Sequence, residues 1–334
     1  MNASIKAISY FLPQQVLTNT DLCVLFPELN EELVWKSSGI KYRHISADDE
    51  IGSDIAFHAA ETFFEEHDVK KEDIDFLLFC TEGLDYKAPA TSCILQHRLG
   101  FSKTCGTLDI PYGCTGFVYG LSVAKGLIES EQAKNVLLLT SDVPSKVIHP
   151  EDKELRIIFG DGGAATLISE TSENDKIGEF VFGTDGSGFD KLIVRCSGSR
   201  EFMTKEWMEK YKDADFMKWG RMEMKSSEIF LFAMKVVPPM IRELLEKESL
   251  SIEDIDMFVF HQANVQMLDV IRKKMKIPSD KFIIDMENTG NTVSATIPIA
   301  LKNAITKGLI KKGNKIMLCG FGIGLSWAGT IIEI

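Results

Sequence analysis

The sequence predicts an α/β fold built on mostly parallel sheets and assembled from two related halves. Apolar runs of strand length alternate with amphipathic segments of helical length along the 334 residues, and this alternation favours parallel sheets covered by helices. The runs 136–141 and 316–320 are almost entirely apolar, as in strands that are buried on both faces of a sheet. The helical patterns are clearest over residues 54–66, 117–129, 228–247 and 295–307.

Two stretches of the sequence recur at almost the same separation, which indicates an internal duplication. Glu-Asp-Ile-Asp followed by an apolar run occurs at residues 72–79 and again at 253–260. Gly-Leu-Ile, with an apolar run after it, occurs at 126–139 and again at 308–319. The starting residues are 181 and 182 positions apart. No repeat of about 20–50 residues is present, so a solenoid is not expected.

The duplication predicts where the halves lie. We expect an amino-terminal half over residues 1–175 and a carboxyl-terminal half over residues 176–334. The stretch 198–226 is rich in Met, Lys, Glu and Trp and shows no clear period, so we interpret it as an insertion in the second half. Its composition fits a mobile cap and an ordinary exposed helix pair equally well.

Composition and charge exclude several classes of protein. The net charge is −12 and the isoelectric point about 5.1, which argues against nucleic acid as the main partner. We expect no secretory signal, because the first residues lack a charged region followed by an apolar stretch. No segment reaches the ~18 apolar residues of a membrane span. The seven cysteines include no Cys-x-x-Cys pair, so we expect a reduced, cytoplasmic protein with neither a disulfide frame nor a metal site.

Cys114 is the most informative single residue. It lies in Gly-Cys-Thr-Gly, between an expected strand end and an apolar helix, and the glycines allow a tight turn there. Unpaired N–H groups and the positive end of the helix dipole converge at such a junction. Both favour the thiolate, which is the nucleophilic form. The position therefore predicts a reactive cysteine, although a buried structural cysteine fits the residue alone equally well.

Three further groups of polar or glycine residues follow expected strands. His261 follows the apolar run 257–260, Asn291 follows the strand-like run 282–285, and the Gly322–Gly324 loop follows residues 316–319. In parallel α/β sheets, reactive groups collect outside the carboxyl ends of the strands. Each of these signals is weak alone, but their common placement predicts that they meet Cys114 in one site.

These motifs together resemble the β-ketoacyl-ACP synthase III family. The resemblance runs along the whole chain and rests on Gly-Cys-Thr-Gly-Phe at 113–117, His-Gln-Ala-Asn at 261–264, Asn-Thr-Gly-Asn-Thr at 288–292 and Gly-Phe-Gly-Ile-Gly-Leu-Ser-Trp at 320–327. It implies the thiolase fold, with two βαβαβαββ halves in a five-layered αβαβα sandwich, normally as a homodimer. The internal repeat agrees with such a duplication.

The resemblance also implies a chemistry. Cys114 would accept an acyl group from acyl-CoA or an acyl carrier protein, and a malonyl thioester on acyl carrier protein would then lose CO₂. His261 and Asn291 would donate hydrogen bonds to the enolate oxygen, and the backbone N–H groups of Cys114 and Ile323 would form a second oxyanion hole. The β-ketoacyl product would serve fatty-acid initiation or specialised metabolism. No cofactor beyond these substrates is implied.

The chain departs from the family at the expected entrance and acyl pocket. Leu33, Ser37 and Lys153 stand where the family has a Trp and two Arg residues that grip coenzyme A. We therefore expect the starter to arrive on a carrier protein, or coenzyme A to bind differently. Ala88 replaces a Phe that closes the acyl tunnel of short-chain enzymes, so we expect a longer or bulkier acyl group than acetyl. Phe159, in a motif shared with the family, is assigned to the same pocket.

A basic cluster follows the His261 motif on an expected helix. Arg272, Lys273 and Lys274 stand out in a chain of net charge −12. Such a cluster is usually a solvated helix face, but near a site mouth it suits the acidic surface of a carrier protein. We expect it to be a carrier-protein docking surface.

Three other functions compete with a decarboxylating condensing enzyme. A related enzyme would move the acyl group from Cys114 to an oxygen, nitrogen or carbon nucleophile without loss of CO₂. A papain-like hydrolase shares the order Cys, His, Asn, with His261 lying 147 residues after Cys114, but it lacks the Cys-Gly-Ser-Cys-Trp signature. An inactive scaffold subunit would normally lack the cysteine.

Overall fold

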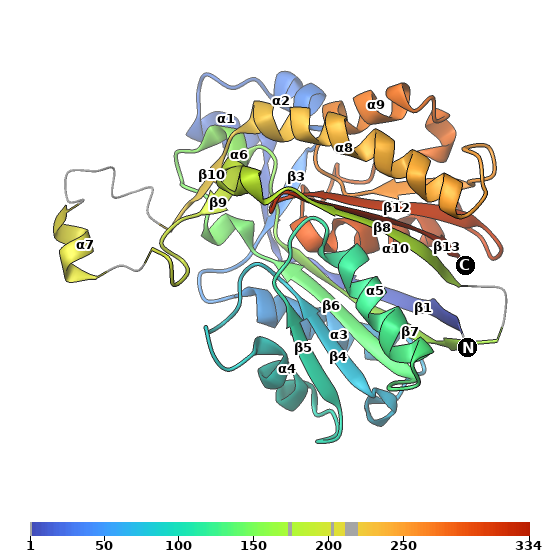
Figure 1. Cartoon of the computed structure of the whole chain (residues 1–334). Helices are drawn as coiled ribbons and strands as arrows, with labels where there is room; N and C mark the ends of the chain where they lie inside the picture. The colour runs from blue at the N-terminus through green and yellow to red at the C-terminus, as the bar shows by residue number, and fades with distance from the viewer. Residues whose placement is uncertain (1, 173–175, 202–203, 211–219) are drawn as a thin grey trace.

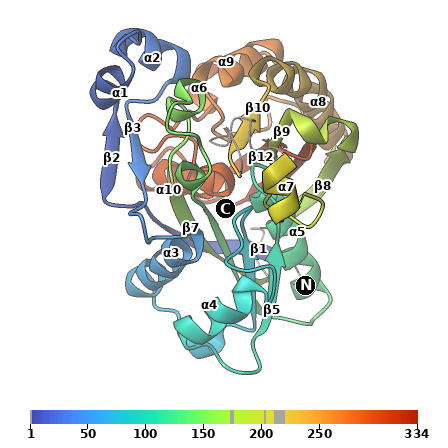
Figure 2. The same cartoon turned by 90° about the vertical axis from the view of Figure 1, so that its left-hand side faces the viewer.

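Two stacked sheets with helices outside and between them form the body of the protein. The computed structural model describes residues 2–172, 176–201, 204–210 and 220–334. Figure 1 shows five layers in the order helix, sheet, helix, sheet, helix, and Figure 2 shows the same stack from its side. The layers agree with the predicted five-layered sandwich.

The amino-terminal sheet has five strands in the order β1-β7-β6-β4-β5. β4 runs parallel to both β5 and β6, whereas β7 is antiparallel to β6 and β1. β6 is buried along almost its whole length, as its apolar sequence predicts. The bounds are β1 (Asn2–Phe11), β4 (Phe76–Cys80), β5 (Gly106–Ile110), β6 (Asn135–Asp142) and β7 (Gly162–Thr171).

The carboxyl-terminal sheet repeats four of these strands in the order β11-β12-β13-β8. β11 is parallel to β12, and the other two pairings are antiparallel, so β11 and β12 match β4 and β6 of the first sheet. These are the strands that carry the repeated sequences. The bounds are β8 (Ile177–Thr184), β11 (Met257–Phe260), β12 (Lys315–Gly322) and β13 (Ser326–Glu333).

The prediction of a strand over residues 282–285 is wrong. Only an isolated bridge between Phe258 and Phe282 forms there. The side chain of Gln262 explains why, because its oxygen accepts a hydrogen bond from the Asp285 N–H at 2.8 Å and its amide donates to the Ile283 carbonyl at 3.3 Å. A side chain thus satisfies backbone groups that a neighbouring strand would otherwise pair.

The helices fill the remaining three layers, and all four expected helices are present. α5 and α10 lie between the sheets, α3 and α4 cover the outer face of the first sheet, and α8 and α9 cover that of the second. α5 can approach β6 closely because Gly120 has no side chain; a Cβ atom at that position would lie 2.7 Å from Leu138. The bounds are α3 (Gly52–Glu66), α4 (Thr91–Leu99), α5 (Gly116–Glu129), α8 (Ser226–Lys247), α9 (Val265–Lys274) and α10 (Thr296–Thr306).

Small elements surround one edge of the stack. A buried arginine, Arg43, joins two of them, because its guanidinium donates to Asn19 at 2.6 Å and to the Ile157 carbonyl at 3.1 Å. The bounds are α1 (Asn19–Leu25), α2 (Glu31–Ser38), α6 (Lys153–Arg156) and the ribbon of β2 (Gln15–Thr18) and β3 (Tyr42–Ile45).

The predicted insertion lies partly outside the described residues. β9 (Leu192–Val194) pairs with β10 (Met222–Met224), and α7 (Lys205–Lys210) lies between them in sequence and projects from the body in Figure 1. Residues 202–203 and 211–219 are not described. Across the described part of the chain, every helix is too short or too polar to cross a membrane.

Candidate active site

Three of the predicted residues meet in one pocket. Cys114 follows β5 and immediately precedes α5, His261 follows β11, and Asn291 lies in the turn before α10. All three line the same cavity and are buried, with exposed fractions of 7%, 2% and 4%. The carboxyl ends of strands from both sheets therefore converge on one site, as the sequence predicts.

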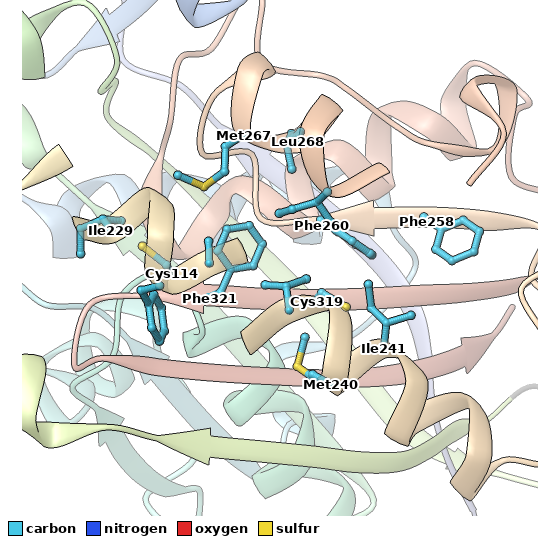
Figure 3. Close-up of a cluster of buried hydrophobic side chains, with 14 of the residues drawn as sticks. Cys114, Ile229, Met240, Ile241, Phe258, Phe260, Met267, Leu268, Cys319 and Phe321 are labelled. Atoms are coloured by element: carbon cyan, nitrogen blue, oxygen red, sulfur yellow. The ribbon is translucent and has the colours of Figure 1, made fainter. Parts of the chain in front are cut away.

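Cys114 packs directly against the backbone of two glycines, Gly320 and Gly322. A side chain at Gly322 would meet the Cβ and Sγ of Cys114 at 2.7 Å, and a side chain at Gly320 would meet the Cys114 carbonyl oxygen at 2.8 Å. Figure 3 shows Cys114 at the edge of the apolar cluster that contains Phe321 and Met267. The nucleophile is thus enclosed by apolar groups and tightly apposed backbone.

The surroundings of Cys114 do not favour the thiolate, although its place before a helix does. Burial, and after it the charge of Glu82, raises the pKa of the Cys114 thiol well above its ordinary value. The backbone N–H of Ile323 opposes this by hydrogen bonding toward the sulfur, but its effect is smaller. Because apolar surroundings disfavour the charged form, the resting group is the thiol, and it must lose a proton to react.

His261 is held as a neutral imidazole. Burial lowers its pKa to about 3, because a low-dielectric pocket disfavours the imidazolium ion. Its backbone N–H donates to the Cys319 carbonyl at 2.8 Å, and its Nδ1 lies 2.7 Å from the Thr296 Oγ1. The Thr296 hydroxyl also lies within hydrogen-bond distance of the Val293 carbonyl, at 3.0 Å.

Asn291 is fixed by its own turn. Its side-chain oxygen accepts a hydrogen bond from the Val293 N–H at 2.9 Å, which leaves the amide nitrogen to point elsewhere. That nitrogen has only a long contact of 3.5 Å, with the Ala263 carbonyl. Val293 adopts a φ of +53°, a conformation that is rare for a β-branched residue and that costs about 1–3 kcal/mol. The turn around Asn291 is therefore strained, as is common at functional sites.

The rest of the pocket wall is mostly apolar and comes from several elements. The lining side chains are Ile158, Phe159, Leu192 of β9, Met224 of β10, Ile229 of α8, Met267 of α9 and Phe321 of β12. The β9–β10 ribbon, whose second strand lies inside the predicted insertion 198–226, thus contributes directly to the pocket wall. Sequence reasoning missed this contribution, because the region carries no periodic signal.

Comparisons with known proteins agree with this geometry. Family models described as 3-oxoacyl-[acyl-carrier-protein (ACP)] synthase III and its C terminal match residues 108–186 and 245–334. The β-ketoacyl-[acyl-carrier-protein] synthase III of Caldanaerobacter subterraneus subsp. tengcongensis is 36% identical over 331 residues, which are 99% of this chain and 97% of the relative. The chain belongs to the β-ketoacyl-ACP synthase III family.

Solved structures of the family confirm the fold and the class of enzyme. A 2.1 Å crystal structure of a 3-oxoacyl-(acyl-carrier-protein) synthase III has a TM-score of 0.94 and 42% identity, with 100% of both chains covered. The priming β-ketosynthase of the R1128 polyketide biosynthetic pathway has a TM-score of 0.89 and 28% identity, and covers 100% of this chain and 96% of its own. The protein therefore has the thiolase fold and is an acyl-transferring condensing enzyme, as predicted.

The other residues that the family resemblance assigned to the acyl and pantetheine pocket are scattered. Phe159 lines the Cys114 cavity, but the other four do not. Leu33 is 66% exposed on α2, and the Ser37 hydroxyl donates to the Val34 carbonyl at 3.0 Å. Lys153 pairs with Glu28 at 2.9 Å. Ala88 lies in the exposed loop after β4. Their predicted roles at the entrance and pocket of this synthase III homologue stay predictions.

The predicted docking cluster lies on α9, and its charges are partly compensated. Arg272 and Lys273 both pair with Asp269, at 2.8 and 2.5 Å, and the Lys274 ammonium donates to the Met234 carbonyl at 2.9 Å. Asp269 therefore reduces the net positive charge of this face of the condensing enzyme.

Two carboxylates near the nucleophile were missed. Asp142 ends β6 and accepts hydrogen bonds from the Ser294 N–H and hydroxyl. Glu82 follows β4 and lies beside Gly113. Both stand at the carboxyl ends of strands, so the rule that selected His261 would also have selected them. The prediction did not include Glu82 and Asp142, because neither residue lies in the motifs that carry the family resemblance.

Proposed function

We propose that the protein joins an acyl group to a malonyl-derived carbon by decarboxylative Claisen condensation, in two steps on Cys114. The observation that supports this most directly is the convergence of Cys114, His261 and Asn291 on one buried pocket. A thiol supplies a nucleophile, and a neutral imidazole with an amide supplies two uncharged hydrogen-bond donors.

In the first step the Cys114 sulfur attacks the carbonyl carbon of an acyl thioester. Negative charge develops on the carbonyl oxygen, and the backbone N–H groups of Cys114 and Ile323 are the proposed donors to it. The Ile323 N–H hydrogen-bonds toward the Cys114 sulfur and lowers the pKa of the thiol. A donor beside the sulfur supports this proposed role. Collapse of the tetrahedral intermediate expels the carrier thiol and leaves an acyl-enzyme.

In the second step a malonyl thioester loses CO₂ and becomes an enolate. His261 and Asn291 would each donate a hydrogen bond to its oxygen, and a buried donor of this kind is worth about 2.7–4 kcal/mol of barrier. The low pKa of His261 fits this role, because a neutral imidazole can donate a hydrogen bond without transferring its proton. The enolate carbon then attacks the acyl-Cys114 carbonyl, and the carbon–sulfur bond breaks to release the β-ketoacyl product and the Cys114 thiolate, which takes up a proton from water to restore the thiol.

The pocket and its surroundings support proposals about the substrates. The apolar wall that includes Leu192 and Met224 suits an acyl chain, and Ala88 in place of a ring is consistent with a starter longer than acetyl. The pairing of Lys153 with Glu28 leaves less charge for a phosphate of coenzyme A, which favours a carrier-bound starter. A malonyl group on acyl carrier protein is the proposed extender, with α9 as the docking face.

We also propose that the protein is a cytoplasmic homodimer, and that the two halves of each chain divide near residue 175. All seven cysteines are free thiols, and the cytoplasm keeps thiols reduced. β5 is the edge strand of its sheet, and it carries the exposed Leu108, while the neighbouring loop exposes Leu84 and Tyr86. An apolar edge strand of this kind is normally covered, here by a second copy.

The proposal is tested by loading and by CO₂ release. Intact mass spectrometry after incubation with a panel of acyl thioesters should show acylation of the native protein and none of Cys114→Ser. The loaded enzyme should then release CO₂ from malonyl thioester together with a β-ketoacyl product, and His261→Ala or Asn291→Ala should reduce this about 100-fold or more. Acyl transfer without CO₂ release would contradict the condensation and favour a non-decarboxylating acyltransferase.

A further inference from the structure

A carboxylate lies beside Gly113, the residue before the nucleophile, and the two-step mechanism does not use it. Glu82 is the second residue after β4, and its backbone N–H donates to Asp142 at 2.8 Å. A side chain at Gly113 would lie 2.5 Å from both the Glu82 Cδ and Oε1. The carboxylate therefore occupies the space that glycine leaves open beside the residue preceding Cys114.

In the part of the chain that the structure describes, no cation compensates the Glu82 carboxylate. Within the described ranges, no hydrogen-bond donor, lysine, arginine or histidine contacts its oxygens. The titratable groups that face it are Asp142 of β6, Cys80 of β4 and Cys114 before α5. Glu82 as a whole retains access to solvent, but its carboxylate end lies against the protein, and burial followed by the charge of Asp142 raises its pKa.

The chemistry of Cys114 requires a proton acceptor. The thiol must lose its proton to attack a thioester, and its surroundings hold that proton firmly. His261 is a poor acceptor, because burial lowers its pKa to about 3. The Glu82 carboxylate, whose pKa burial raises to about 8, is better matched to the task. A proton that moves from Cys114 to Glu82 also leaves the total charge of the two groups unchanged.

We propose that Glu82 takes the proton of the Cys114 thiol during acylation, directly or through one water molecule. The S–H bond breaks, its electron pair stays on sulfur, and the proton goes to a Glu82 oxygen. The sulfur then forms a bond to the acyl carbon, and the bond from that carbon to the carrier sulfur breaks. The departing thiolate receives the proton from Glu82, which returns to its carboxylate form. This role rests on the proposed acylation of Cys114.

The alternative is a carboxylate that only repels charge, and it predicts the opposite sign. A spectator Glu82 disfavours the thiolate, so its removal would lower the pKa of Cys114 and make the sulfur more reactive. Removal of a proton acceptor would make the sulfur less reactive. A single substitution, Glu82→Gln, therefore distinguishes the two.

The experiment compares the native protein with Glu82→Gln and with the matched control Glu72→Gln, an exposed glutamate near the opposite end of β4. Two rates are measured between pH 6 and 9, the alkylation of Cys114 by iodoacetamide and its acylation by an acyl thioester. At pH 7, Glu82→Gln should slow both alkylation and acylation of Cys114 by about 10-fold or more. In the native protein both rates should rise with pH as Glu82 loses its proton, and this rise should be absent in Glu82→Gln. Equal or faster rates in Glu82→Gln would overturn the proposal.

Chemical rescue provides a readout that a structural role would not move. Because Glu82 reaches the surface, formate should be able to enter the space left in Glu82→Gly and restore several-fold of the lost rate. Chloride at the same concentration should not. A rate that formate leaves unchanged would contradict proton transfer by a carboxylate at this position. Thermal unfolding of each variant checks that the fold is retained.

The design separates this inference from the proposed function. Alkylation by iodoacetamide needs no acyl substrate, so it tests Glu82 even if no thioester loads Cys114. Failure of the native protein to load would refute the condensing mechanism. A native protein that loads and condenses, with an unimpaired Glu82→Gln variant, would refute only the role of Glu82.

Discussion

The Thr296 Oγ1 lies 2.7 Å from the Nδ1 of His261, and this contact controls which ring nitrogen carries the proton. The threonine hydroxyl has one hydrogen, and it donates this hydrogen to the Val293 carbonyl at 3.0 Å, so donation to Nδ1 requires the hydroxyl to turn away from Val293. Donation to Nδ1 leaves the hydrogen of the neutral ring on Nε2. Only that arrangement lets Nε2 donate to an enolate oxygen.

Thr296→Val should therefore impair decarboxylation and spare acylation. Valine has nearly the same shape but no hydroxyl, so no hydrogen can be turned toward the Nδ1 of His261, and the tautomer with its hydrogen on Nε2 loses that support. We expect CO₂ release from malonyl thioester to fall about 10-fold, or ~1.4 kcal/mol, with an unchanged rate of Cys114 acylation. Thr296→Ser keeps the hydroxyl and should retain activity. An equal loss in both steps would indicate general damage to the site.

Gly322→Ala should block the nucleophile. The new methyl group would lie 2.7 Å from the Cβ and Sγ of Cys114, which is far inside contact distance. We expect the rate of acylation to fall at least 100-fold and unfolding in urea to reveal a loss of about 1–3 kcal/mol. Gly126→Ala is the matched control, because it lies in a helix with no atom within 4 Å of the new group, and it should leave acylation unchanged.

The buried neutral state of His261 should make the protein less stable in acid. Its pKa is lowered from 6.5 to about 3, so between these values the unfolded chain binds a proton that the native state does not. The free energy of unfolding therefore falls as pH decreases from about 6.5 toward 3, by at most ~1.4 kcal/mol per pH unit from this group. Urea unfolding of the native protein and of His261→Gln should show a shallower acid loss in the variant.

The native protein must be compared with His261→Gln because Asp142 changes the free energy of unfolding in the opposite direction as the pH falls. Burial raises the pKa of its carboxyl, so the native state binds that proton more readily than the unfolded chain does. The contribution of Asp142 is shared by both proteins and cancels in the difference. Parallel curves for the native protein and His261→Gln would refute the assignment of a neutral histidine.

Asp142→Asn should destabilise the site and the junction between the two halves. The Asp142 carboxylate accepts from the Glu82 N–H at 2.8 Å, from the Thr81 hydroxyl at 3.2 Å and from the Ser294 N–H at 3.2 Å. An amide at this position turns one acceptor into a donor that faces other donors, at a cost of about 1–3 kcal/mol. Urea unfolding should show this loss, while the exposed Asp280→Asn should not change the midpoint.

Charge reversal on α9 tests the docking surface. Lys273→Glu combined with Lys274→Glu should raise the KM for malonyl-acyl carrier protein several-fold, because it places negative charge against an acidic partner. The KM for free malonyl-CoA should stay unchanged. Lys103→Glu, which lies before β5, serves as a control for net charge. Equal effects on both substrates would contradict a docking role.

Much of the candidate site could be predicted because its signals are local. Glycines around Cys114 and the apolar runs before His261 are properties of short segments, and the carboxyl ends of parallel strands share one edge of a sheet. The repeated Glu-Asp-Ile-Asp similarly identified β4 and β11 as equivalent strands. Such patterns require no knowledge of which distant segments touch.

Other features depended on contacts that short segments do not encode. The helix dipole favoured a thiolate at Cys114, but burial by both halves reversed the balance. The run 282–285 has strand-like residues, yet the side chain of Gln262 binds its backbone. Lys153 stands where the family has an Arg that grips coenzyme A, and its partner Glu28 lies 125 residues away in sequence.

The sequence by itself determined the two-sheet architecture, the family and the three residues Cys114, His261 and Asn291 that meet in one pocket, because hydrophobic periodicity and turn chemistry act over a few residues. Only the tertiary structure decided the protonation of Cys114 and His261, the position of Glu82 beside Gly113 and the part that Leu192 and Met224 play in the pocket wall. Proton affinity and pocket shape depend on what surrounds a group in three dimensions, and those surroundings come from segments far apart in the chain.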